Sequence, residues 1–410
     1  MASPTDQQQK TNQKNAIVLS SGGALGAYEV GVMKALLTGQ SPVTQNQPLD
    51  PSIFTGASIG AFNAAFMVSQ QGETDFVSAI NSLEQLWLEE IAETPDHPNG
   101  MYRFRINPDV VLDPRSYIKE PVETLTHLVE DSVFLFRESI SRMVHLATSS
   151  DSISKSLIHF INLSSFVSVD PYEHLIEKTI QFENIQRSQI PLRIISTNWT
   201  QGNLVFFTNQ ELTHQLGPRM VRASGSLPGF FPSVEIEGQL HVDAGVLGYA
   251  KLIPAIEVNA DIMHVIYPNP NVAELPQEHR ASTFHEMFRT FDTIWSNRVR
   301  RSSEILTSLD QLAVFLKRVV ENNGVSRDSA IEILLDMIPT GGFETAKTRE
   351  GKNAFVQDTV HFYFPKVDQV GWGGFFDLNH KRVENLIRAG YNDTVHHNCE
   401  KNGCILPQQI

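Results

Sequence analysis

Short apolar runs and helical periodicity alternate near the start of the chain. Residues 16–19 are apolar and end in serines and glycines, after which apolar positions recur at helical spacing. The same unit follows at once, with a strand-like run at 52–55, a glycine-bounded turn at 56–60 and a helical pattern at 61–68. Each unit predicts a strand, a turn and a helix. Two successive units predict an α/β fold, in which a parallel sheet is covered by helices.

The rest of the chain continues this pattern as one domain, which we expect over residues 15–395. Helical insertions are predicted at about 75–185 and 280–340, and polar tails at 1–14 and 396–410. A last helix is predicted from Asp377 to Gly390, with Asp377 or Asn379 as N-cap and Gly390 as C-cap. Strand signals recur at residues 192–196, 204–207, 239–242, 262–267 and 361–364.

Composition narrows the class of protein. Hydrophobic residues make up 41% of the 410 residues and charged residues 19%, as in ordinary globular proteins. The net charge of −14 argues against non-specific nucleic-acid binding. The polar N-terminus does not resemble a secretory signal, and no apolar run approaches the roughly 20 residues of a membrane span. We therefore expect a soluble, cytoplasmic protein, and any contact with membranes would be peripheral.

The two cysteines, Cys399 and Cys404, are too few for a disulfide framework. Together with His396 and His397 they form a loose group of metal-binding residue types near the C-terminus. Their spacing matches no strong zinc pattern. We therefore expect no metal site and no cofactor.

The second predicted turn has the form G-x-S-x-G, with Gly56, Ser58 and Gly60. Glycines on both sides allow a serine to stand on a sharp strand-to-helix turn with its hydroxyl exposed. The start of the helix would also place backbone N–H groups and a positive dipole end near the reacting oxygen. Ser58 is therefore the candidate nucleophile.

The first predicted turn contains Gly22, Gly23, Ala24 and Gly26. Small residues let the backbone approach a substrate, so its N–H groups are candidates for an oxyanion hole. Both turns would follow the carboxyl ends of parallel strands, where ligands bind in open α/β sheets. A nucleotide-binding loop is the alternative, but Ser21 replaces a required glycine, and neither the ribose-binding acid nor G-K-[ST] is present.

Asp243, within H-V-D-A-G-V, is the candidate base, on a turn that Gly245 would permit. A Ser–His–Asp triad is the alternative to a Ser–Asp dyad. The dyad explains the order better, because Ser58 follows only the second strand and no later histidine stands in a recognisable setting. Those histidines are His264, His279, His285, His361, His380, His396 and His397.

This arrangement resembles the patatin-like phospholipase family, which has a glycine-rich loop, a G-x-S-x-G nucleophile and a D-G-[GA] aspartate in this order. The segments 191–207, 223–232 and 376–391 also resemble blocks of that family. The resemblance implies a three-layer α/β/α domain with a mostly parallel central sheet. It implies a lipid acyl hydrolase of phospholipase A or lysophospholipase type, with Ser58 and Asp243 as catalytic residues and a phospholipid or fatty-acyl ester as substrate.

The sequence departs from the family pattern at three positions. Ser21 stands where the loop usually begins with glycine, Leu25 where Arg or Lys is common, and Ala244 where the aspartate motif has glycine. These departures keep open a weakly active or inactive relative that binds lipid or acts as a scaffold. The sequence identifies no protein activator.

Overall fold

The chain folds around one mixed sheet, and the two glycine-rich turns lie where its strands end. The computed structural model describes residues 13–20, 22–94, 100–101, 103–104, 167–228, 230–247, 254–255, 258, 260–267, 293, 359–366 and 377–406. The insertion expected at 280–340 lies outside this part, apart from residue 293, and so does most of the first insertion. Within the described part, a two-stranded sheet pairs β3 (Arg103–Phe104) with β4 (Val167–Ser168).

The main sheet has eight strands, ordered β10-β9-β1-β2-β5-β8-β7, with β6 paired to β5. Alternate residues of β1 face opposite sides of this sheet, and they belong to two separate apolar clusters. The strands are β1 (Asn15–Leu19), β2 (Pro51–Ala57), β5 (Leu192–Asn198), β6 (Asn203–Thr208), β7 (Val234–Ile236), β8 (Gln239–Asp243), β9 (Ile262–Ile266) and β10 (Thr359–Tyr363).

The strands β10, β9, β1, β2 and β5 are parallel to their neighbours, whereas β6 and β8 pair antiparallel with β5, and β7 pairs antiparallel with β8. The two strands expected to precede the glycine-rich turns are indeed parallel neighbours, since Leu19 pairs with Gly56. Their turns therefore emerge at the same edge of the sheet. This mostly parallel sheet with its helices is the α/β architecture predicted from the sequence.

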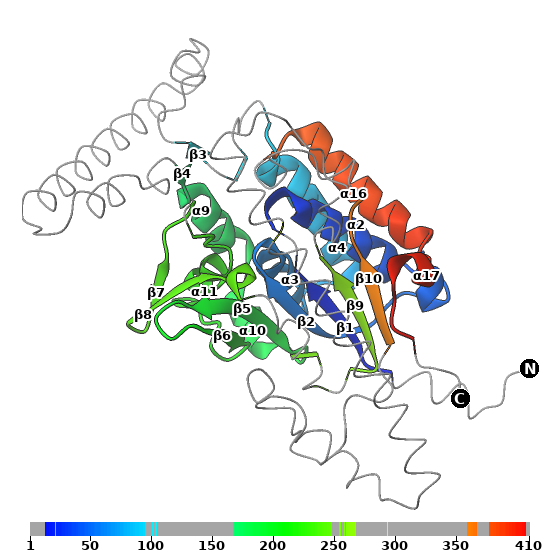
Figure 1. The fold of residues 1–410 in the computed structure, drawn as a ribbon, viewed down its shortest axis with the longest axis horizontal. Helices are drawn as coiled ribbons and strands as arrows, with labels where there is room; N and C mark the ends of the chain where they lie inside the picture. The colour runs from blue at the N-terminus through cyan, green and yellow to red at the C-terminus, as the bar shows by residue number, and fades with distance from the viewer. Residues whose placement is uncertain are drawn as a thin grey trace, which may run out of the picture.

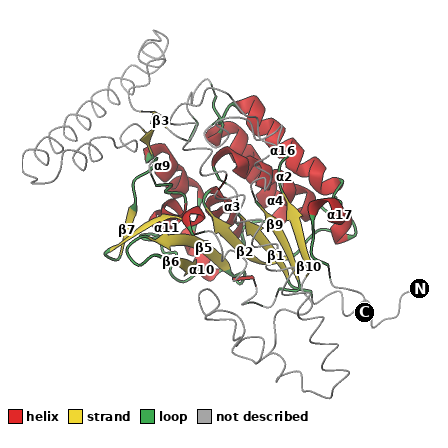
Figure 2. Ribbon diagram, viewed as in Figure 1, coloured by secondary structure: helices red, strands yellow, loops and turns green. Residues whose placement is uncertain are grey.

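Helices pack on the sheet, as Figure 2 shows. Most of the buried apolar residues lie between these helices and one face of the sheet. The second face packs against Ala255, Val258 and Ala260. The helices are α2 (Gly26–Leu37), α3 (Ile59–Ser69), α4 (Phe76–Leu86), a π-helical turn (Trp87–Ile91), α9 (Asp170–Thr179), α10 (Phe182–Arg187), α11 (Gly217–Ser224), α16 (His380–Val395) and α17 (Cys399–Asn402). None of the helices that the structure describes is both long and apolar enough to cross a bilayer.

The helices α2 and α16 lie side by side (Figure 1), and glycine makes this contact close. A Cβ atom on Gly390 would lie 2.2 Å from the carbonyl oxygen of Tyr28, and one on Gly31 would lie 1.9 Å from that of Ile387. The prediction that Gly390 ends its helix is wrong, because α16 continues to Val395. Gly390 is there for helix packing. The predicted N-cap is confirmed at Asn379, whose side chain accepts the N–H of Lys381.

Residues at both ends of the described chain are built into the sheet rather than into tails. Lys14 donates its N–H to Asp261 Oδ2 at 2.8 Å, and its carbonyl accepts the N–H of Asp261. Near the other end, Ile405 exchanges two backbone hydrogen bonds with Val360 of β10. The expected tails are therefore shorter than the sequence pattern indicates.

Candidate active site

Ser58 stands between the end of β2 and the start of α3. It is the N-cap residue of α3, with φ 55° and ψ −131°, a region that residues with side chains rarely adopt. The flanking glycines make the turn tight: a Cβ on Gly56 would lie 2.4 Å from the Gly60 carbonyl oxygen, and one on Gly60 would lie 2.7 Å from that of Leu19. The G-x-S-x-G pattern is therefore a steric requirement of this turn.

The strained backbone at Ser58 predicts an unusual order of stability. An unfavourable φ/ψ pair costs about 1–3 kcal/mol for a residue with a Cβ atom and far less for glycine. We expect the free energy of unfolding of Ser58→Gly to be about 1 kcal/mol higher than that of Ser58→Ala. The relief of strain exceeds the stability that glycine loses by raising the conformational entropy of the unfolded chain. Urea unfolding of the two variants measures the difference. A Ser58→Gly variant no more stable than Ser58→Ala would show that the turn is unstrained.

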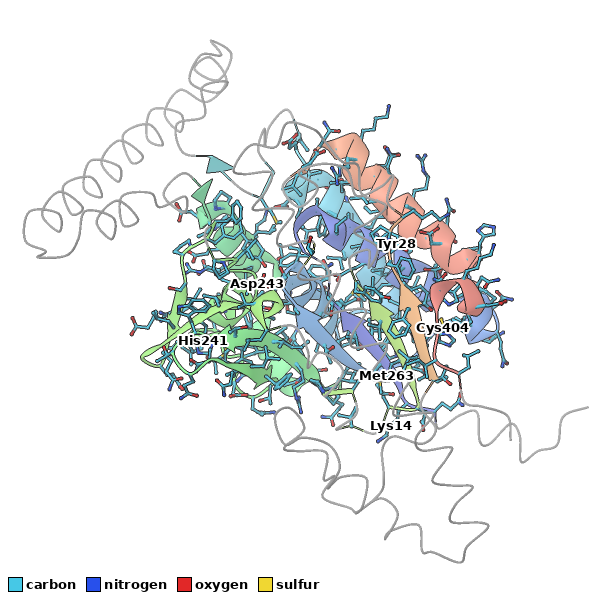
Figure 3. The ribbon with its side chains drawn as sticks, in the orientation of Figure 1. Lys14, Tyr28, His241, Asp243, Met263 and Cys404 are labelled. Atoms are coloured by element: carbon cyan, nitrogen blue, oxygen red, sulfur yellow. The ribbon has the colours of Figure 1, made fainter. Side chains whose placement is uncertain are left out.

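The ends of β2 and β8 meet head to head along one edge of β5. Ile195 of β5 pairs with Ala57 on this edge, and the next residue, Ser196, pairs with Asp243. The other edge of β5 is occupied by β6 over the same residues. Successive residues of a strand are about 3.3 Å apart, so Ala57 and Asp243 are neighbours along this edge. Ser58 directly follows Ala57. Figure 3 shows Asp243 at the boundary between β8 and the segment that carries α3.

The last residue of α11 and the segment that follows it bridge the two candidate residues. The hydroxyl of Ser224 accepts the N–H of Ser58 at 3.0 Å and donates to the Ile195 carbonyl at 2.5 Å. Two residues later, the carbonyl of Ser226 accepts the N–H of Asp243 at 2.9 Å. Sequence reasoning assigned no role to Ser224, although it lies in the A-S-G-S-L-P block that resembles the family.

Asp243 is buried, with 3% of its surface exposed. Its Oδ1 accepts the N–H of Gly245 at 2.6 Å, and its carbonyl accepts the hydroxyl of Thr197 at 3.0 Å. Ala244 then begins a 3₁₀ turn, a conformation open to any residue, and its methyl group packs against Ala57 and Ile195. The departure at Ala244 is therefore accommodated in this chain.

The glycine-rich loop reaches the same place from β1. Gly23 has φ 54°, which favours glycine, and it begins a 3₁₀ turn that leads into α2. Leu25 in this turn is fully buried in the apolar core, where the Arg or Lys of the family pattern would be hard to accommodate. Gly26 lies against Trp87 and Ile59, with no space for a Cβ atom. Ser21 lies outside the described residues.

A small pocket joins these elements at Ser58. Its volume is ≈ 10 Å³, about the space of one water molecule. Arg222 brings a cationic group to it and forms an ion pair with Glu173 of α9. The pocket is lined by Gly23, Ser58, Ile59, Val169, Tyr172, Arg222, Gly225, Ser226 and Phe231.

The pocket lining, as far as the chain is described, contains no histidine. His264 and His361 lie in the middle of β9 and β10, at the level of Ile17 in β1, away from the strand ends. His241 is closer to Asp243 along β8, but its Nδ1 contacts the Ser196 hydroxyl at 2.9 Å, and burial lowers its pKa. The candidates His279 and His285 lie outside the described residues.

A buried polar network fixes the two helices that start at the site. Asn63 of α3 donates to Glu29 of α2 at 2.8 Å and to the Gly26 carbonyl at 3.1 Å, and it accepts the indole N–H of Trp87 at 2.9 Å. All three side chains are fully buried. Because hydrogen bonds in a low-dielectric interior are directional and costly to lose, this network holds α2 and α3 in one relative position.

Comparison with known proteins identifies the family of this chain. A family model described as "Patatin-like phospholipase" matches residues 17–251, which is more than half of the chain. The chain belongs to the patatin-like phospholipase family. The match begins in β1 and extends just beyond Asp243, so it includes both glycine-rich turns. Membership in the patatin-like phospholipase family supports lipid hydrolysis at the level of the family.

The individual relatives are distant. Uncharacterized NTE family proteins from Mycobacterium bovis and Mycobacterium tuberculosis are 27% identical over 136 residues, which cover 33% of this chain and 34% of each relative. The match thus spans only about a third of those proteins. A crystal structure of VipD from Legionella pneumophila aligns with a TM-score of 0.35 and 14% identity, covering 95% of this chain and 67% of that one.

Proposed function

We propose that this protein is a lipid acyl hydrolase of phospholipase A or lysophospholipase type, with Ser58 as nucleophile and Asp243 as base. The observation that carries this proposal is the head-to-head meeting of β2 and β8 on β5. It brings a strained serine and a buried carboxylate together from segments far apart in sequence. The family match supports the substrate class, a fatty-acyl ester.

The reaction proceeds in two acyl transfers. Ser58 Oγ attacks the ester carbonyl while Asp243 takes the hydroxyl proton, and a tetrahedral intermediate forms. The ester C–O bond then breaks, the alcohol leaves with the proton from Asp243, and the acyl group remains on Ser58. Water attacks this acyl-serine with Asp243 again as base. The fatty acid is released and Ser58 regains its proton.

The developing negative charge on the carbonyl oxygen needs fixed donors. The backbone of Gly22, Gly23 and Ala24 is the proposed source, and Gly23 lines the pocket beside Ser58. The first N–H groups of α3 have no partners within the helix and favour an anion at the same place. Arg222 adds a positive charge to the pocket wall, whereas the loop itself carries Leu25.

The pocket constrains how substrate arrives. Space for one water molecule does not admit a fatty-acyl chain. Its apolar walls include Val169, Tyr172 and Phe231, which come from the start of α9 and the segment after α11. A bound ester therefore requires these side chains to move apart. The described residues of the lining include no histidine, and they do not include Asp243 either. Asp243 is the proposed base because β8 ends next to the end of β2 along β5.

Covalent labelling tests the proposal. A fluorophosphonate reacts with an activated serine and leaves a stable phosphonyl group, so it reports nucleophilicity without knowledge of the natural substrate. We expect the full chain to take up one label, and peptide mass spectrometry to place it on Ser58. The natural substrate class is then compared by incubation with diacyl phospholipid, lysophospholipid and a medium-chain chromogenic ester.

Two variants serve as controls. Ser58→Ala is expected to take up no label, whereas Ser78→Ala, at an exposed position of α4, should label like the natural chain. A folded protein that takes up no label and cleaves none of the three esters would contradict the proposal and identify a catalytically silent relative. Labelling at another serine would show that Ser58 is not the nucleophile.

A further inference from the structure

Four side chains of metal-binding type converge at the edge of the sheet that lies farthest from β8. They are His361 of β10, His397 after α16, Cys399 at the start of α17, and Cys404 just beyond it. One donor atom of each lies within 4.8 Å of all the others. Figure 3 shows Cys404 beside β10, toward the opposite edge of the sheet from Asp243.

We propose that His361, His397, Cys399 and Cys404 bind one Zn²⁺ ion. Zinc in a structural site takes four ligands in a tetrahedron, with Zn–S near 2.3 Å and Zn–N near 2.0–2.1 Å, which puts donor atoms about 3.4–3.8 Å apart. The observed separations are close to this: His397 Nε2 lies 3.2 Å from Cys404 Sγ, and His361 Nδ1 lies 3.5 Å from Cys399 Sγ.

The backbone holds the two sulfur atoms in place. The N–H of Cys404 donates to the Cys399 carbonyl at 2.9 Å, across a turn in which Gly403 has φ 65°. The next residue, Ile405, is fixed to Val360 of β10 by two hydrogen bonds, so Cys404 is held against the strand that carries His361. The cluster therefore depends on tertiary structure and is not a chance meeting of mobile side chains.

A second group of contacts surrounds the donors. The N–H of Phe362 points at Cys404 Sγ at 3.5 Å, a contact that stabilises negative charge on sulfur. The side-chain Nδ2 of Asn402 donates to the Phe362 carbonyl at 2.9 Å and lies 3.4 Å from His397 Nδ1. This contact leaves His397 Nε2 as the ring atom that faces the thiol.

The donor set selects the class of ion. Two sulfur and two imidazole donors suit zinc and related soft or borderline ions, whereas calcium and magnesium require oxygen donors. Two thiolates would balance the charge of Zn²⁺, which favours such an ion in a partly buried place.

The site is closed, because all four positions of a tetrahedron are taken by protein. Closed zinc sites stabilise a fold, whereas catalytic ones keep one position for water. Strands β9, β1, β2 and β5 separate it from Asp243 in the order of the sheet. We therefore expect the ion to join α17 to β10 and to leave the chemistry at Ser58 unchanged. This inference does not depend on the proposed hydrolase activity.

Metal analysis of the full chain tests the site. The protein is expressed with zinc in the medium, purified with its thiols reduced, and measured by elemental mass spectrometry, with about one zinc per chain expected. Zinc is then removed with a chelator and replaced by Co²⁺. A tetrahedral site with two sulfur ligands gives intense visible bands and a thiolate-to-cobalt charge-transfer band. This spectrum is recorded on the natural chain, so the test does not require a variant to fold.

Variants locate the ion. Zinc competition against a chromophoric chelator is expected to show at least 100-fold weaker binding in His397→Gln and in Cys404→Ser. His396→Gln, one residue away and outside the cluster, should bind like the natural chain. The same competition is run on Cys399→Ser/Cys404→Ser, which also removes any disulfide between the two thiols.

The contrary results are equally definite. If the chain is isolated with a Cys399–Cys404 disulfide, it is reduced and the zinc competition is repeated. A reduced, folded chain that binds zinc no more tightly than the double variant would overturn the proposal and leave a hydrogen-bonded cluster of histidines and thiols. Octahedral cobalt bands without charge transfer from sulfur would overturn it as well.

Discussion

Ser58→Ala and Asp243→Asn are each expected to reduce kcat for a medium-chain chromogenic ester by about 10⁴-fold or more. Removing the nucleophile eliminates the acyl-serine route, and removing the carboxylate leaves the Ser58 proton without an acceptor. Each factor of ten corresponds to about 1.36 kcal/mol of transition-state stabilisation, so the expected loss is at least about 5.4 kcal/mol. Steady-state kinetics of purified, folded variants measure both effects.

The double variant provides the sharpest test of a dyad. Catalytic residues that act as a unit are strongly non-additive, so Ser58→Ala/Asp243→Asn should be no slower than Ser58→Ala alone. Asp50→Asn, at an exposed position before β2, is the matched control and should retain full activity. If Asp243→Asn kept kcat within tenfold of the natural enzyme, the base would lie elsewhere and a histidine outside the described residues would become the candidate.

Gly390→Ala is expected to lower the free energy of unfolding by about 3 kcal/mol. In an unconstrained helix this change would stabilise by about 1 kcal/mol, because alanine favours the helix. Here the added methyl group would lie 2.2 Å from the Tyr28 carbonyl oxygen and 3.0 Å from the N–H nitrogen of Val32. The helices α2 and α16 must separate, and overpacking of this kind costs about 1–3 kcal/mol or more. Urea unfolding measures the change.

An exposed position on the same helix separates packing from helix propensity. Glu384→Ala on α16 should shift the free energy of unfolding by less than about 0.5 kcal/mol. A Gly390→Ala variant as stable as the natural chain would show that the two helices have room to separate without loss. Close packing against α2 would then not explain why glycine stands at position 390.

The two strand-turn-helix units of the candidate site were predictable because their signals are local. Gly56 and Gly60 flank Ser58 within five residues, and the strand and helix on either side have clear apolar patterns. The parallel pairing of β1 with β2 followed from the repetition of the same unit. Asp243 was found as a candidate because its motif stands in a recognisable order after the serine.

The rest depended on contacts between distant residues. The ends of β2 and β8 meet because β5 pairs with both strands on one edge. The five residues of β8 do not indicate that this strand runs antiparallel to β5. Gly390 was misread as a C-cap because glycine commonly ends a helix, whereas its actual reason lies in the opposing backbone of α2. His361 could not be joined to the C-terminal histidine and cysteines, since it precedes His397 by a long stretch of sequence.

The pairing of Ile405 with Val360 has a consequence for how molecules of this protein behave toward one another. Among the described strands β10 is the outermost of the sheet on this side, and an open strand edge favours pairing with a strand of another molecule. Here the last described residues of the chain occupy two of the hydrogen-bonding groups on that edge, and α17 lies beside it. We therefore expect this short segment to hinder edge-to-edge pairing between molecules, a role separate from the chemistry proposed for Ser58.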